Sequence, residues 1–113
     1  LATSKPEVYA AQILEHFSLD KYFTSICGAS MDEKRVDKAD VIKYALDTNG
    51  ISDKSKVIMI GDRLHDIIGA AKNGLSSIGV LWGYGSREEL TEAGADNIAE
   101  NIPEMVKIIL GNN

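Results

Sequence analysis

A short apolar segment that ends in a glycine and an aspartate constrains the fold of this sequence most strongly. Residues 57–60, Val-Ile-Met-Ile, are continuous and rich in β-branched side chains, which predicts a strand buried on both faces of a parallel sheet. Gly61 permits a sharp turn and the close approach of a ligand. We therefore expect Asp62 at the carboxyl end of a buried strand, the edge at which open α/β sheets bind ligands.

A second aspartate, Asp66, follows in the first turn of a predicted helix. The apolar face of this helix is predicted by residues at helical spacing, Leu64, Ile67, Ile68 and Ala71. Asp66 complements the helix dipole there and needs no function to explain it. Placing Asp62 at the end of a buried strand costs desolvation free energy, which a bound cation would offset. Together the two carboxylates suit Mg²⁺, which takes one or two protein carboxylates along with waters and a substrate phosphate.

Length and composition limit the class of protein. The chain has 113 residues, 44% of them apolar and 26% charged, as expected for one globular domain. A net charge of −5 argues against a nucleic-acid partner, and no apolar run is long enough for a membrane span. Without a signal-peptide pattern, and with Cys27 as the single cysteine, we expect a cytoplasmic protein in which Cys27 is a core residue.

The first residues predict a strand end followed by a helix. Leu1 and Ala2 resemble the end of a strand, and residues 3–7, Thr-Ser-Lys-Pro-Glu, form a helix-start signature with Ser4 as the cap and Glu7 completing a capping box. The helix that follows is expected to bury Val8, Ala11, Leu14 and Phe17. Thr3 then lies where backbone N–H groups and a hydroxyl can bind an anion, although such a pair more often only caps a helix.

Strands and helices alternate along the rest of the chain. We expect strands at residues 24–28, 76–81 and 95–98, and helices at 38–49, at 86–93 and from Pro103, with a turn at 19–23 that buries aromatic side chains. Asn73-Gly74 is expected to close the helix that carries Asp66. The last helix should face inward through Met105, Val106, Ile109 and Leu110. This alternation predicts the α/β class with a parallel sheet. Lys38 stands in a first helical turn, where its charge opposes the dipole; it is either a surface lysine or a residue used at the ligand edge.

At Gly61, Asp62 and Asp66 the sequence resembles the haloacid dehalogenase-like (HAD) hydrolases, and most of all their phosphoglycolate phosphatase group. The family's fourth motif is G-D-x-x-x-D after a buried strand. Its second motif, a strand-ending Thr or Ser, is matched by Thr3, and its third, a lysine before a helix, by Lys38. The loop at 82–85 and the residues at 94–96 also look like that group. The resemblance implies a Rossmann-like three-layer parallel sheet.

One departure from the family is large. Its first motif, D-x-D, carries the nucleophilic aspartate, yet this chain has no two aspartates separated by one residue, and the cap segment that follows the motif is missing. The resemblance therefore implies that residues 1–113 are the carboxyl-terminal part of a phosphatase core domain, incomplete at its central strand. The chain alone is expected to be inactive and to pair its open strand edges with an amino-terminal segment or with another copy of itself.

The resemblance also implies roles for individual residues. The parent protein would hydrolyse a small phosphorylated metabolite through an aspartyl-phosphate, with Mg²⁺ held by Asp62 and Asp66. Thr3, Ser4 and Lys38 would bind the phosphate, and Thr3 and Lys38 would take part in catalysis. Whether Lys38, Lys34 or Arg35 is the cation of the phosphate site stays open.

Two other functions are compatible with parts of the sequence. A non-catalytic module could keep the fold and bind Mg²⁺ or phosphate. A phosphate-accepting signalling domain also places an aspartate after a buried strand, but it requires an acidic pair after an earlier strand and a lysine after a later one. Here the acidic pair Asp32-Glu33 lies in a predicted loop, and Trp82-Gly83 follows the later strand, so this third function is the least favoured.

Overall fold

The computed structural model describes residues 1–32, 35 and 37–111 of the chain. Glu33 and Lys34, part of the predicted charged loop, lie outside the described residues. The structure divides into two compact units, Leu1–Ser52 and Asp53–Asn113, and each is described by itself. All strand pairs are parallel, so the predicted α/β class is confirmed.

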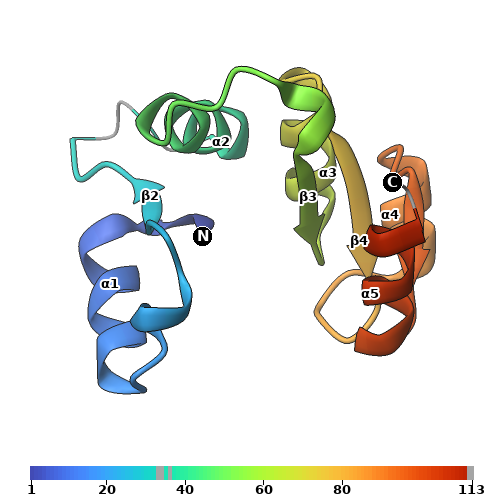
Figure 1. The fold of residues 1–113 in the computed structure, drawn as a ribbon, viewed down its shortest axis with the longest axis horizontal. Helices are drawn as coiled ribbons and strands as arrows, with labels where there is room; N and C mark the ends of the chain where they lie inside the picture. The colour runs from blue at the N-terminus through green and yellow to red at the C-terminus, as the bar shows by residue number, and fades with distance from the viewer. Residues whose placement is uncertain (33–34, 36, 112–113) are drawn as a thin grey trace. The chain divides into compact units, whose positions relative to one another are not determined.

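The first unit packs two helices against a pair of parallel strands. Its elements are β1 (Ala2–Pro6), α1 (Glu7–His16), the 3₁₀ turn η1 (Asp20–Tyr22), β2 (Cys27–Ala29) and α2 (Lys38–Thr48) (Figure 1). β1 pairs with β2, with Ala2 opposite Cys27. The core is made of small and branched side chains, Ala10, Cys27, Ala29, Val41, Ile42 and Leu46. Cys27 is thus the core residue that the sequence predicts.

The predicted helix start at Ser4 is wrong. β1 continues through Pro6, the residue before α1, and no side chain caps α1 by a hydrogen bond. The reason lies in Glu7, which the capping box requires to fold back. Instead, its Oε1 accepts a hydrogen bond from the Gly28 backbone N–H at 3.2 Å and lies 3.5 Å from Arg35 Nη2. Glu7 therefore bonds residues that are distant in sequence and does not form the predicted capping box.

The expected burial of apolar side chains in this part of the chain is also partly wrong. Val8 in α1 and Phe17 directly after it are exposed, and α1 buries Ala10 instead. The aromatic residues of the turn at 19–23 are exposed as well, Tyr22 to 73%. The helix predicted at 38–49, in contrast, is confirmed as α2, and Gly50 follows it with a φ of +67°, the left-handed conformation that ends many helices.

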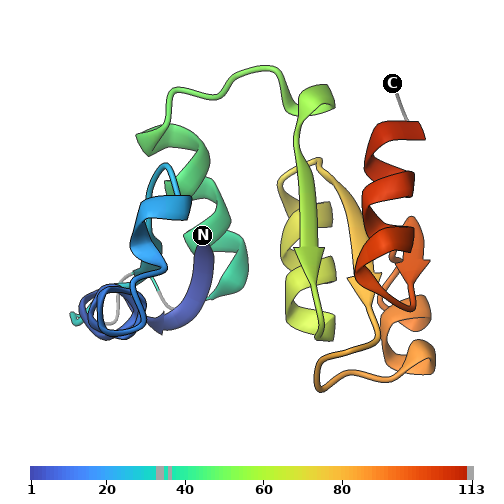
Figure 2. The same cartoon turned by 60° about the horizontal axis from the view of Figure 1, so that its bottom comes forward.

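The second unit is a three-stranded parallel sheet with helices on both faces. After the 3₁₀ turn η2 (Lys54–Lys56), the order along the chain is β3 (Ile58–Gly61), α3 (Leu64–Lys72), β4 (Ser76–Val80), α4 (Arg87–Glu92), β5 (Asn97–Ala99) and α5 (Ile102–Gly111). The strands lie in the order β3-β4-β5. Figure 2 shows α3 and α5 on opposite faces of this sheet, a local three-layer arrangement.

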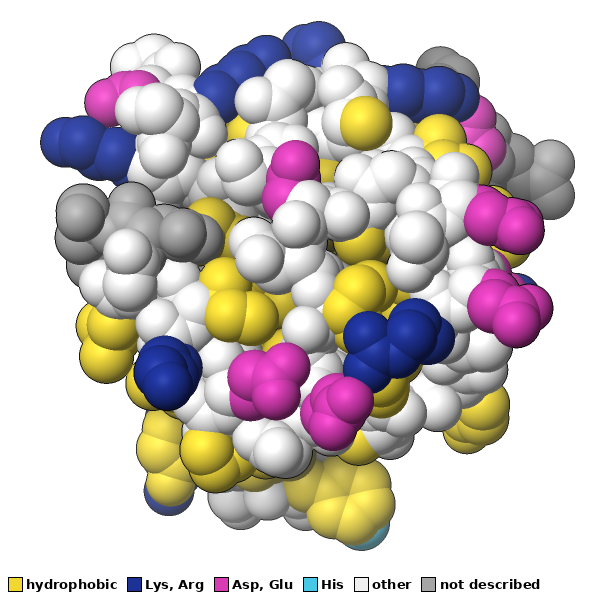
Figure 3. All heavy atoms as spheres, turned by 90° about the vertical axis from the view of Figure 1, so that its right-hand side faces the viewer, with side chains coloured by type: hydrophobic (Ala, Val, Ile, Leu, Met, Phe, Trp, Pro, Cys, Tyr) yellow, Lys and Arg dark blue, Asp and Glu magenta, His cyan; other side chains and the backbone are white. Residues whose placement is uncertain are grey.

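One face of this sheet holds a core of Ile78, Val80 and Ala99, against which α5 packs Met105, Ile108 and Ile109. On the other face Leu90 of α4 packs closely against Gly79, where an added Cβ atom would lie 3.0 Å from Leu90 Cδ1. Val106 and Leu110 were expected to face inward on α5, but they are 42% and 65% exposed. Figure 3 shows hydrophobic side chains reaching the surface between acidic and basic ones.

The apolar sequence of β3 predicts a strand that is buried on both faces, and this prediction is wrong. It lies at the end of the β3-β4-β5 order with β4 as its partner, and Ile60 is 39% exposed. The predicted apolar face of α3 is rotated as well: Ile67 and Ala70 are buried, whereas Ile68 and Ala71 are exposed. Within the described residues, no helix has both the length and the apolar character needed to cross a membrane.

Candidate functional site

The turn between β3 and α3 carries Asp62 at the carboxyl end of the sheet. Only Asp62 and Arg63 separate the last residue of β3 from the first of α3. Because Gly61 is in register with Gly79, the loop that follows β4 reaches the same edge as this turn. In that loop the Tyr84 backbone N–H donates to Asp62 Oδ2, with 2.9 Å between nitrogen and oxygen. The Asp62 carboxylate is therefore oriented by a backbone donor from a neighbouring loop.

Glycines let the two segments come this close. A Cβ atom on Gly83 would collide with the carboxylate of Asp62, and one on Gly85 would collide with the Asp62 carbonyl oxygen. Neither glycine has a positive φ. Close approach, rather than an unusual backbone conformation, is therefore the reason for a glycine at both positions.

Asp66 organises the turn that carries Asp62. Its Oδ2 accepts the backbone N–H of Asp62 at 3.1 Å and of Arg63 at 3.2 Å, and the residue is only 6% exposed. These N–H groups lie at the amino end of α3, where a carboxylate is favoured by both hydrogen bonding and the helix dipole. A Cβ on Gly61 would overlap the Asp66 side chain, so Gly61 is what allows this packing.

The oxygen donors of this turn fit Mg²⁺ in kind but make an incomplete set. Mg²⁺ accepts one or two carboxylates and completes its shell with water and substrate phosphate, and Asp62 with Asp66 supplies carboxylates alone. Among the described residues, no cluster of three or more His, Cys, Asp or Glu side chains is placed to hold a metal ion. The arrangement therefore suits a metal ion whose remaining ligands come from outside this turn.

The other predicted site residues lie in the first unit. Thr3 is half-buried in β1, and its Oγ1 accepts the Lys5 backbone N–H at 3.2 Å; Ser4 beside it is exposed. Lys38 is the first residue of α2, and its Nζ donates to the Ala2 carbonyl oxygen at 3.3 Å. The structure thus brings the Lys38 amine to the strand that carries Thr3.

Arg35, an alternative to Lys38 as the phosphate-site cation, is engaged in the packing of the first unit. Its Nε donates to the Gly28 carbonyl oxygen at 2.8 Å, and its guanidinium lies 3.6 Å from the centre of the Tyr44 ring. Together with the Glu7 ion pair, these contacts hold the side chain in place. Lys34, the remaining alternative, lies outside the described residues.

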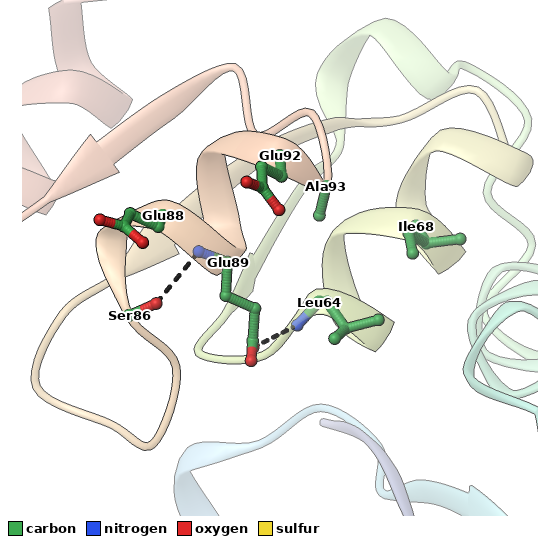
Figure 4. Close-up of a pocket in the computed structure, with 7 residues that line it drawn as sticks. All are labelled: Leu64, Ile68, Ser86, Glu88, Glu89, Glu92 and Ala93. Atoms are coloured by element: carbon green, nitrogen blue, oxygen red, sulfur yellow. Dashed lines mark hydrogen bonds between the residues drawn. The ribbon is translucent and has the colours of Figure 1, made fainter.

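The structure adds one residue that sequence reasoning missed. Glu89 Oε2 accepts the Arg63 Nε–H at 2.9 Å. The same oxygen accepts the Leu64 backbone N–H at 3.0 Å (Figure 4). The Leu64 N–H, followed by the Arg63 guanidinium, holds the pKa of the Glu89 carboxyl below its ordinary value. Because Glu89 and these partners are more than twenty positions apart, no spacing pattern in the sequence indicates the contact.

Comparison with known proteins places these features in a family. A model of the haloacid dehalogenase-like hydrolases matches residues 1–80. The chain is 44% identical over 90 residues to a 5′-nucleotidase of Pseudomonas aeruginosa, an alignment that covers 80% of this chain and 40% of that protein. It is 36% identical over 107 residues to a phosphoglycolate phosphatase of Neisseria meningitidis, covering 91% and 45%.

A solved structure supports the same assignment. The crystal structure of a predicted phosphatase from Clostridium acetobutylicum matches with a TM-score of 0.91 at 54% identity, covering 97% of this chain and 50% of that one. The chain thus spans about half of the solved relative and less than half of the two curated ones. The similarity to phosphoglycolate phosphatases is confirmed, and the chain belongs to the haloacid dehalogenase-like hydrolases.

Proposed function

We propose that these residues belong to a Mg²⁺-dependent phosphate monoester hydrolase of the phosphoglycolate phosphatase type. The observation that carries the proposal is the Asp62 carboxylate, which the Tyr84 N–H orients at the carboxyl end of β3 and whose turn Asp66 stabilises. The nucleophilic aspartate, which forms the aspartyl-phosphate, would be supplied by polypeptide outside these 113 residues.

Asp62 would bind the metal, and Asp66 would support it mainly by fixing the turn. When bound, Mg²⁺ offsets the charge repulsion between an attacking carboxylate and a phosphate group. The buried position of Asp66 and its two backbone donors keep the Asp62 carboxylate in one place, so that little reorganisation is needed when ligands arrive.

The phosphate would be bound by residues of the first unit. The hydroxyl of Thr3 would donate to a phosphoryl oxygen, with Ser4 next to it. The Lys38 amine, which already reaches the Ala2 carbonyl, would offset the negative charge that develops during transfer. Lys38 is proposed for this role because it begins α2 and its amine lies at the strand that carries Thr3.

The proposed substrate class is a small phosphorylated metabolite. The names of the two relatives, 5′-nucleotidase and phosphoglycolate phosphatase, both denote removal of phosphate from such compounds.

The test uses the full-length protein that contains this chain, assayed with Mg²⁺ and a generic phosphate ester. Asp62→Asn should weaken Mg²⁺ binding about 10- to 100-fold and lower kcat by at least about 100-fold. The matched control is Asp20→Asn, because Asp20 is exposed in the first unit. The isolated 113 residues should show no turnover until an amino-terminal segment with D-x-D is added.

Three outcomes decide between the candidate functions. Equal Mg²⁺ affinity in wild type and Asp62→Asn would contradict the metal role. Mg²⁺ binding by the full-length protein without turnover of any phosphate ester tested would favour the non-catalytic module. Turnover by the isolated chain, after rigorous removal of contaminating phosphatase, would mean that one of the aspartates described above is itself the nucleophile.

A further inference from the structure

The loop after β4 and the start of α4 surround the turn that carries Asp62. We call residues 83–86 together with Glu89 the clamp. It meets the turn at three points: the Tyr84 N–H bonds the Asp62 carboxylate, Gly85 lies against the Asp62 carbonyl, and Glu89 bonds the two residues that follow Asp62. Asp62 is thus contacted by the clamp on its side chain, on its backbone and through its neighbours in sequence.

Glu89 is the charged element of the clamp. Its carboxylate accepts one backbone and one guanidinium N–H on the same oxygen, and hydrogen bonds to an ionised group are about twice as strong as neutral ones. Its own backbone N–H donates to Ser86 Oγ at 3.1 Å, the cap of α4. Figure 4 shows Glu89 pointing from α4 toward Leu64, with the bonds to Ser86 and Leu64 drawn. The side chain therefore ties the start of α4 to the start of α3.

The connection to Asp62 is short. A Cβ on Gly85 would lie 2.9 Å from Glu89 Oε2 as well as against the Asp62 carbonyl, so Glu89, Gly85 and Asp62 are in one packed group. If Glu89 releases the Arg63–Leu64 segment, the clamp loses one of its two hydrogen-bonded attachments to the turn. The other attachment is the Tyr84 N–H that orients the Asp62 carboxylate itself.

We propose that Glu89 is a positioning residue for Asp62, acting through the Arg63–Leu64 backbone and the clamp. The inference rests on the proposed function, because it assigns Glu89 a part in placing the Asp62 metal ligand. Glu89 does not touch the substrate or the metal in this scheme. It limits the movement of the turn, so that the carboxylate is already aimed when the metal binds.

The experiment compares Glu89→Ala and Glu89→Gln with Glu88→Ala in the full-length protein. Glu88 is the neighbouring glutamate of α4 and is exposed, so the control removes the same charge from the same helix. The measurements are the Mg²⁺ dissociation constant by calorimetry, kcat and KM with a generic phosphate ester, and amide exchange at Leu64 and Tyr84. All are made well below the unfolding temperature of each variant.

Glu89→Ala should weaken Mg²⁺ binding and lower kcat about 10-fold each, the size seen when a group that orients a metal ligand is lost. KM should change by less than about twofold, and both amides should exchange faster. Glu89→Gln should recover part of the loss, because its amide oxygen can still accept the Leu64 N–H. Glu88→Ala should stay within about twofold of wild type in every measurement.

Two results would overturn the inference, and they are distinguishable. If Asp62→Asn loses Mg²⁺ affinity while folded Glu89→Ala keeps wild-type affinity and kcat, Glu89 only stabilises the fold and the inference alone fails. If Asp62→Asn itself binds Mg²⁺ as tightly as wild type, the proposed function fails and the inference with it.

Discussion

Two of the strand-to-helix junctions of this chain both carry a carboxylate at the helix start, and they differ in structure. The first runs from β1 into α1 around Ser4 and Glu7, and the second from β3 into α3 around Asp62 and Asp66. At the first, the cap is missing and the strand runs straight to the helix. At the second, a buried aspartate accepts two backbone N–H groups of a two-residue turn.

The difference shows what a carboxylate at a helix start depends on. Asp66 has a short side chain and a glycine, Gly61, that leaves room for it, so it bonds the turn on which it stands. Glu7 is longer and reaches a neighbouring strand and Arg35 instead. The same residue class therefore serves a local turn in one junction and long-range packing in the other.

The largest expected effect concerns what the uncapped first junction is used for. If the β1 end is a phosphate site, Lys38→Ala in the full-length protein should lower kcat about 10²- to 10³-fold, because a charge that meets the transferring phosphate is lost. Arg35→Ala should instead act mainly on stability, since Arg35 bonds Gly28 and stacks on Tyr44. Steady-state kinetics with a generic phosphate ester, combined with thermal unfolding of both variants, checks this. A larger loss of kcat in Arg35→Ala would show that the cation is assigned to the wrong residue.

The next effect tests the second junction. Asp66→Ala should lower the free energy of unfolding by about 2–3 kcal/mol, because two backbone N–H groups lose a charged acceptor in a buried place. Asp66→Asn keeps an acceptor oxygen and should lose about half as much. Urea unfolding of both variants measures the difference. Wild-type stability in Asp66→Ala would remove the contrast between the junctions.

The smallest effects belong to the first junction. Ser4→Ala should change the free energy of unfolding by less than about 0.5 kcal/mol, because an exposed strand residue that caps nothing contributes little. Glu7→Ala should lose about 1 kcal/mol, since it removes the bond to the Gly28 N–H and a partly exposed ion pair. Urea unfolding of the two single variants gives the ranking. A loss of 1 kcal/mol or more in Ser4→Ala would mean that Ser4 acts as the cap that its sequence context predicts.

Local patterns in the sequence determined those turns and helix ends whose interacting residues are neighbours along the chain. The order of apolar strand, Gly61 and Asp62 predicts the turn, and Asp66 falls in the first turn of α3 as expected. The helix that begins at Lys38 likewise ends before Gly50. The positive φ of Gly50 is a conformation that glycine adopts by itself, without long-range partners. These signals are reliable because propensity, turn geometry and capping act over a few neighbouring positions.

Only the tertiary structure decided which polar groups face one another and which side of each helix is buried. Glu7 meets Gly28, and Glu89 meets Leu64, across separations of 21 and 25 residues. The exposed Val8 and Leu110 show the same limit for apolar side chains, because hydrophobic spacing indicates a helix without saying which surface will cover it. Contacts between residues far apart in sequence depend on how strands pair and helices pack, and the spacing of residues along the chain does not indicate them.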